Sequence, residues 1–216
     1  MVRLHLISFV VLFSNLFFNN LDALAATGSG DNTKWVTVTQ DEGIEVQERW
    51  VTNEKNIKVR ERSGKMNLNC SGEDILALIS DASRTHLWMS NVESVTVIKT
   101  VSASEWYVHT KLNAPWPFGA QDMVSKYQVI RDSNQKVLKV LISPVNNLMP
   151  KQKDVERLDT FFAEWELTTT ERGKVKVTFT TKSTVPPEYP SWVQDPVVRK
   201  VFFANLRNFK SILVKS

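Results

Sequence analysis

Cysteine and histidine are both scarce in this chain of 216 residues. The single cysteine, Cys70, excludes an intramolecular disulfide. The three histidines stand neither near one another nor near that cysteine at the spacing of zinc ligands. The sequence therefore predicts a fold without disulfides, and it indicates neither a metal centre nor a bound cofactor.

Glycine is also rare. None of the seven glycines belongs to a phosphate-binding loop or to the Gly-x-Ser-x-Gly turn of serine hydrolases. Glu164 and Glu166 come closest to a pair of catalytic acids, but they stand two positions apart on one predicted strand, which favours a solvated strand face. We therefore assign no catalytic residue and expect that the protein is not an enzyme.

Charge of neither sign dominates. The chain has 27 basic and 23 acidic residues, a formal net charge of +4, and no run of basic residues. Nucleic-acid-binding proteins gather basic residues into a patch or stripe. The charge pattern therefore argues against nucleic acid as a partner.

No apolar run at the start of the chain reaches the roughly 18 residues of a membrane-spanning helix. The run from Leu4 to Phe18 is broken by polar residues, and Ala23-Leu24-Ala25 follows with the small-x-small pattern of a signal-peptidase site. We expect a signal peptide over residues 1–26, cleaved near Ala25 or Ala26, and export to a periplasm or secretion. An uncleaved membrane anchor is the alternative interpretation.

The remainder of the chain is even in composition. Residues 27–33 are small and polar and predict a flexible leader. Residues 34–216 contain no linker, repeat or low-complexity tract, so they predict one domain.

Period-two alternation of apolar and polar residues marks most of this domain. Ile44, Val46 and Glu48, for example, share one side of a predicted strand. Such alternation is typical of an antiparallel sheet with one buried face. The predicted strands are residues 44–50, 57–66, 92–101, 104–113, 122–131, 136–143, 157–168 and 174–182.

Two segments have helical periodicity instead. Ser71 and Asp74 form a capping-box pattern ahead of Ile75, Leu78, Ile79 and Ala82. The C-terminal helix carries one apolar stripe: Val198, Val201, Phe202, Leu206, Phe209 and Leu213. Arg199 is expected to lie away from the stripe. Either Asp195 caps this helix ahead of Pro196, or Ser191 caps an earlier start and Pro196 lies inside it; the sequence leaves both open.

Eight strands against one long helix leave more concave apolar surface than the helix covers, which indicates an internal cavity. Alternation places uncharged residues on the inward faces of two neighbouring strands: Trp106, Val108 and Thr110, then Met123, Ser125 and Tyr127. The other predicted lining residues are Phe161, Trp165, Val198, Phe202 and Leu206. His109 alternates onto the opposite face, which we take as outward.

Two further features bear on the cavity. Trp116 and Phe118 lie in a proline-rich connection, residues 114–121, where they either pack beneath the loop or contact lipid; the flanking prolines favour packing for Trp116. Arg157 alternates onto the face of Phe161 and Trp165, where a buried cation needs a partner. We predict a structural ion pair between Arg157 and Asp122.

The stretch Trp106-Tyr107-Val108-His109 followed by residues 115–124 (PWPFGAQDMV) resembles the START domain, a branch of the helix-grip superfamily. The resemblance extends to Trp35 with residues 43–46, Trp88-Met89, Arg157 with Trp165, and residues 190–192 and 203–206, in the family's order. It covers about residues 34–213. The family's Arg-Asp pair is Gln121-Asp122 here, so a cholesterol-specific site is not carried over.

The resemblance implies an α+β helix-grip fold, in which a curved antiparallel β-sheet packs around a long C-terminal α-helix and encloses an apolar cavity. It implies binding, and transfer, of a lipid or sterol-like ligand, with residues 114–121 and the C-terminal helix as a gate and with transient membrane contact. One rival is an aromatase/cyclase-like enzyme of the same superfamily, which predicts an inward acid, histidine or arginine with a shifted pKa. The other is a secreted interaction domain with a filled core.

Overall fold

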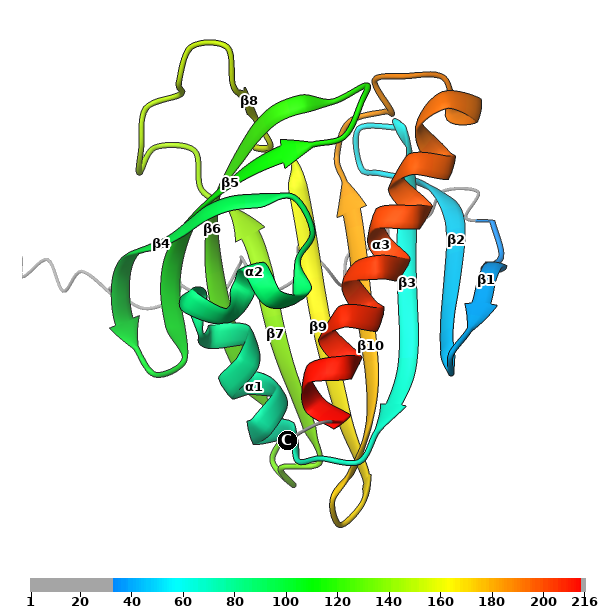
Figure 1. Ribbon diagram of the computed structural model, residues 1–216, viewed down its shortest axis with the longest axis vertical. Helices are drawn as coiled ribbons and strands as arrows, with labels where there is room; N and C mark the ends of the chain where they lie inside the picture. Colours follow the sequence, from blue (N-terminus) through cyan, green and yellow to red (C-terminus); the bar gives the residue numbers. More distant parts are fainter. Residues whose placement is uncertain (1–32, 215–216) are drawn as a thin grey trace, which may run out of the picture.

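One curved antiparallel sheet forms the body of the protein in the computed structural model, which describes residues 33–214 (Figure 1). Its strand order is β1-β2-β3-β10-β9-β7-β6-β5-β4, and β8 pairs with β6 in parallel. The strands are β1 (Val36–Asp41), β2 (Ile44–Thr52), β3 (Lys58–Leu68), β4 (Val92–Ser102), β5 (Glu105–Ala114), β6 (Gly119–Arg131), β7 (Val137–Pro144), β8 (Glu156–Arg157), β9 (Phe161–Glu171) and β10 (Lys174–Ser183).

The predicted helix-grip fold is confirmed, with two differences among its strands. No strand was predicted over β1, whose side chains are exposed or half-buried in the structure. The single strand predicted over 157–168 was wrong. Arg157 ends the two-residue β8, and β9 begins only at Phe161. Arg157 therefore belongs to the segment beside β6 and does not share a strand face with Trp165.

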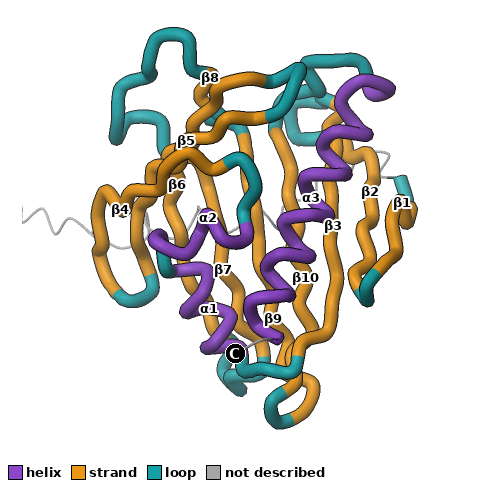
Figure 2. Tube along the Cα trace, viewed as in Figure 1, coloured by secondary structure: helices purple, strands orange, loops and turns teal. Residues whose placement is uncertain are grey.

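The helices all lie on the concave face of the sheet (Figure 2). They are α1 (Gly72–Ser80), the short 3₁₀ turn η1 (Ala82–Arg84), α2 (Thr85–Trp88) and α3 (Ser191–Val214). The capping box predicted at α1 is present, with the Ser71 side chain accepting from the Asp74 N–H and the Asp74 carboxylate accepting from the Ser71 N–H. No helix within residues 33–214 has both the length and the hydropathy of a membrane span. The signal peptide predicted over residues 1–26 lies outside the described residues.

The structure decides between the two predicted starts of α3. The helix begins at Ser191, where the Pro190 carbonyl accepts from the N–H groups of Val193 and Gln194. Pro196 lies inside the helix, so Asp195 is not its cap. This frees the Asp195 side chain for contacts with the sheet.

Gly64 sets how closely α3 approaches the sheet. It lies on the inward face of β3, and a Cβ atom added there would stand 2.2 Å from Leu206 Cδ1 and 3.2 Å from a Phe202 ring carbon. Neither neighbour can yield without moving the helix, because both side chains are buried. Glycine is therefore required at this position by the packing of the helix and not by the backbone conformation.

We expect Gly64→Val to lower the free energy of unfolding by about 1–3 kcal/mol, since overpacking a tight core displaces its neighbours. Gly72→Ala is the matched control, because nothing lies within 4 Å of a Cβ atom built there. Urea unfolding of both variants is the measurement. Equal stability of Gly64→Val and the parent would show that α3 is not held against β3 as described.

Candidate functional site

The inward faces of β5 and β6 carry the residues predicted from alternation. The register pairs Trp106 with Tyr127, Val108 with Ser125 and Thr110 with Met123. All except the half-buried Tyr127 are at most 7% exposed. The Trp106 and Tyr127 rings stack with their centroids 5.3 Å apart. This wing of the sheet therefore presents an apolar wall with the Thr110, Ser125 and Tyr127 hydroxyl groups as its polar elements.

Tyr127 is the half-buried member of this wall. Burial raises the pKa of its phenol to about 12, so protein atoms surround the group and disfavour its charged form. The residue nevertheless keeps accessible surface.

An aromatic cluster fills the space beneath the second half of α3. Trp165 of β9 stacks between Phe179 of β10, at 4.1 Å, and Phe209 of α3, at 4.6 Å. Trp88 meets both Trp165 and Phe209 edge-on. Trp165, predicted as a lining residue, is thus part of a packed core in this conformation. Leu206 is buried beside it, at 2% exposure.

Phe202 lies one turn before Leu206, and its ring stacks on Phe179 at 5.6 Å. The predicted lining residues Val198 and Phe161 are half-buried. A pocket of 570 Å³ lies away from these residues, at the ends of β1, β2 and β3, where Asp41, Lys65 and Lys176 contribute to its wall.

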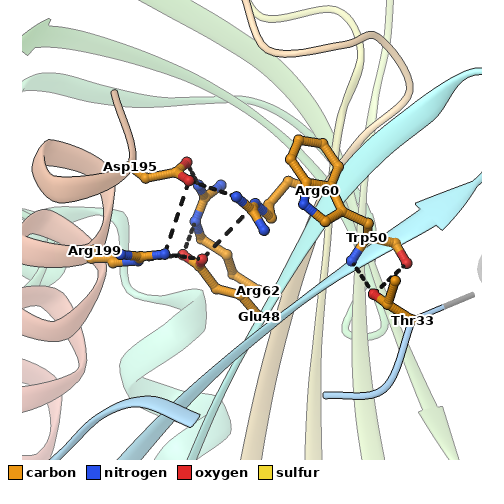
Figure 3. A network of polar contacts seen from close by, with 7 residues as sticks. All are labelled: Thr33, Glu48, Trp50, Arg60, Arg62, Asp195 and Arg199. Atoms are coloured by element: carbon orange, nitrogen blue, oxygen red, sulfur yellow. Dashed lines mark hydrogen bonds and ion pairs between the residues drawn. The ribbon is translucent and has the colours of Figure 1, made fainter. Parts of the chain in front are cut away.

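A buried network of charged side chains lies at the other end of the inner face, between β2, β3 and the first turns of α3 (Figure 3). We call it the arginine cluster; its members are Glu48, Arg60, Arg62, Asp195 and Arg199. The cluster was not predicted from the sequence: Arg199 was expected only to lie away from the apolar stripe of the helix, and its contact with Glu48 of β2 was not foreseen. The signal was present in Glu48, which alternates with the inward residues Ile44 and Val46.

Two carboxylates hold the arginine cluster together. Glu48 accepts from Arg62 Nε at 2.9 Å and from Arg199 Nη2 at 2.8 Å. Asp195 accepts from Arg62 Nη2 at 2.9 Å and from Arg60 Nη2 at 2.5 Å. The Arg60 guanidinium also lies 4.0 Å from the centroid of the Trp50 ring. The cluster therefore fastens α3 to both β2 and β3.

Burial and charge act in opposite directions on these groups. For Glu48, burial raises the pKa, but hydrogen bonding to Arg199 and the charges of Arg62, Arg199 and Arg60 outweigh it, so the pKa is lowered. Burial lowers the pKa of Arg62, against the opposing effect of Glu48 and Asp195. Glu48 therefore stays ionised near neutral pH and serves as an acceptor, not as an acid.

Asp122 and Arg157, the two residues that the sequence predicts as an ion pair, do contact one another. Arg157 Nε donates to Asp122 Oδ1 at 2.6 Å, and Arg157 Nη2 donates to Oδ2 at 2.9 Å. The pair lies on the face of β6 opposite Met123 and Ser125. Arg157 also donates to the Met149 and Pro150 carbonyls, so the pair ties residues 145–155 to the outside of the sheet.

His109 belongs to the same buried group. Its Nε2 atom lies 2.9 Å from Asp122 Oδ2, and the residue is 6% exposed. His109 lies on the outward face of the sheet, as expected. Its side chain is nevertheless buried there and not exposed to solvent. β8 and Leu158 lie against this part of the sheet, as Arg157 and Leu158 pair with the Asp122 backbone.

The proline-rich connection lies at the same end of the molecule as the start of α3 (Figure 1). Trp116 is 78% exposed, which contradicts the expectation that it packs beneath the loop. Phe118 is half-buried and meets the Tyr189 ring edge-on at 5.5 Å, and the Tyr189 hydroxyl donates to the Pro117 carbonyl. Trp192, in the first turn of α3, is 80% exposed.

The START domain family model matches residues 15–215, so the chain belongs to the START domain family. A search of curated proteins gives no match to this chain.

Solved structures share the fold. A STAR-related lipid transfer protein from Xanthomonas axonopodis is 24% identical, with a TM-score of 0.71 over 84% of this chain and 99% of that chain. Human StAR-related lipid transfer protein 5 is 13% identical, with a TM-score of 0.69 over 89% and 90% of the two chains. The Zhui aromatase/cyclase from Streptomyces sp. R1128 is 10% identical, with a TM-score of 0.51 over 72% and 93%.

Proposed function

We propose that this protein binds a lipid or another apolar small molecule between the sheet and α3. The observation that carries the proposal is the inward wall of β5 and β6, where Trp106, Val108 and Met123 are apolar and the half-buried Tyr127 adds a hydroxyl group. Membership of the START family supports it, as does the likeness to lipid transfer proteins. Each Å² of apolar ligand surface removed from water would stabilise the complex by roughly 25 cal/mol.

The packed aromatic cluster means that a ligand enters by displacing part of α3 or of the β5–β6 connection. The contacts between Phe118, Pro117 and Tyr189 join these two segments. We propose that they form the gate, and that Trp116 and Trp192 contact a membrane during transient transfer, since tryptophan favours the membrane interface.

We expect the double substitution Trp116→Ala with Trp192→Ala to lower the affinity for phospholipid vesicles by about tenfold, because the two most exposed aromatic side chains are lost. Vesicle cosedimentation is the measurement. Stability should change by less than about 0.5 kcal/mol, as for other exposed positions. Vesicle binding equal to that of the parent would contradict the proposed membrane contact.

An enzyme resembling the aromatase/cyclases is the second candidate. Glu48 and Arg62 favour it, because both face inward with shifted pKa values. Two observations favour binding instead: Glu48 is held ionised by its arginine partners, and neither His86 nor His109, the histidines of the described region, faces the interior.

The deciding experiment is native mass spectrometry of the protein purified without detergent, followed by organic extraction. We expect a co-purifying apolar molecule in near-stoichiometric amount. A protein that arrives empty and takes up neither fluorescent lipids nor sterols would overturn the proposal. Conversion of an added polyketide-like substrate would favour the enzyme.

We further propose that residues 1–26 direct export and are removed near Ala25 or Ala26, on the sequence pattern alone. N-terminal sequencing of the protein recovered outside the cytoplasm tests this. A chain that retains its first residues there would contradict cleavage.

A further inference from the structure

The arginine cluster directly borders the apolar part of the inner face. On β2 and β3, the inward pair Glu48 and Arg62 lies next to the inward pair Val46 and Gly64 along the ladder. On α3, Asp195 and Arg199 precede Phe202, which packs on Phe179 and above Gly64. A molecule that lies along the apolar surface toward this end therefore meets charge within one helical turn of Phe202.

The arginine cluster has more positive charge than its carboxylates balance. Three guanidinium groups face two carboxylates, so one positive charge is in excess when all five groups are ionised. All four carboxylate oxygens already accept a guanidinium hydrogen bond. The side chains of Arg60 and Arg62 are 14% and 11% exposed, and that of Arg199 is 36% exposed. A buried excess charge is costly unless a counter-charge completes it.

The arginines also have donors to spare. Within residues 33–214, no Nη1 atom of Arg60, Arg62 or Arg199 donates a hydrogen bond to a protein group. Among the nitrogen atoms of these three arginines, Arg60 Nε alone is fully enclosed without a hydrogen-bond partner. The unused Nη1 groups therefore retain accessible surface, and planar guanidinium groups are well matched to oxyanions.

We propose that the ligand is an acidic amphiphile whose singly charged oxyanion binds Arg60, Arg62 and Arg199 while its apolar chain lies along the inner face beside Phe202. The carboxylate of a fatty acid and the phosphodiester of a phospholipid share this chemistry. The inference rests on the proposed function, because it specifies the class of ligand for the same interior.

The test compares pairs of probes that differ in charge. Oleic acid is matched with oleyl alcohol, and dioleoylphosphatidylglycerol with dioleoylglycerol, with bound ligand measured by native mass spectrometry after equilibration. We expect at least one acidic probe to bind about tenfold or more tightly than its neutral partner, as for hydrogen bonds to charged groups. Preference in the first pair alone indicates a carboxylate ligand, and preference in the second alone a phosphodiester.

Arg199→Gln should reduce that preference by about tenfold. Arg199 is the most accessible arginine of the cluster, and its removal leaves Glu48 paired with Arg62, so the fold should persist, as thermal unfolding will show. Arg199→Lys should restore part of the preference. Arg207→Gln is the matched control, since Arg207 lies on the same helix, is 50% exposed and has only a 3.8 Å contact with Glu42.

The outcomes separate this inference from the proposed function. Neutral probes that bind as well as acidic ones would overturn the acidic ligand and leave apolar binding intact. A preference that survives Arg199→Gln would place the anion elsewhere and overturn the site. Failure of all four probes to bind would count against both proposals.

Discussion

Arg157→Met is expected to lower the free energy of unfolding by about 3–5 kcal/mol, because it leaves the buried Asp122 carboxylate with His109 as its remaining contact. Asp122 is 0% exposed, and the Arg157 side chain is 2% exposed. The variant also loses both donors to the Met149 and Pro150 carbonyls, so residues 145–155 should become susceptible to protease. Urea unfolding and limited proteolysis are the measurements.

The control for Arg157→Met is Lys174→Met, which removes an exposed ion pair with Glu171 and should cost no more than about 1 kcal/mol. The double substitution Asp122→Leu with Arg157→Met should cost less than Arg157→Met alone, because no charge is then left buried. If Arg157→Met alone is as stable as the parent, the Asp122–Arg157 pair does not hold residues 145–155 against the sheet.

The same pair makes stability depend on pH. Burial raises the pKa of Asp122, but hydrogen bonds from Arg157 and His109 and their charges outweigh it, so the pKa is lowered in the folded state. The stabilisation is therefore present above the unfolded value of about 3.9 and is lost as pH falls through the folded value. Arg157→Met should therefore reduce the loss of stability that occurs as the pH falls. An unchanged pH dependence of stability would contradict the assignment of this effect to Asp122.

Phe209→Ala is expected to lower the free energy of unfolding by a similar amount, about 3–5 kcal/mol. Phe209 is 0% exposed and contacts both Trp165 and Trp88, so its removal leaves a cavity at the centre of the aromatic cluster. Trp192→Ala on the same helix is the control and should change stability by less than about 0.5 kcal/mol, because its side chain is 80% exposed.

Urea unfolding of both variants measures the difference. A small effect of Phe209→Ala, comparable with that of Trp192→Ala, would show that α3 does not anchor the core through this ring. It would also remove the reason for expecting α3 to resist ligand entry.

Period-two alternation was enough to assign the faces of two central strands, β5 and β6. Alternation along residues 104–113 and 122–131 placed Trp106, Thr110 and Tyr127 together, and the observed register agrees. It succeeded because successive strand residues point to opposite faces whatever surrounds them. The capping box at Ser71 was predictable for the same kind of reason, since its partners are three residues apart.

What packs against each face became known only from the three-dimensional arrangement of the chain. Glu48 could be placed inward by alternation, but its partner Arg199 is 151 residues away, and no local pattern brings them together. His109 was placed on the correct face, yet the segment that buries it belongs to a distant part of the chain. Periodicity follows from local backbone geometry, whereas burial and pairing depend on how remote segments pack.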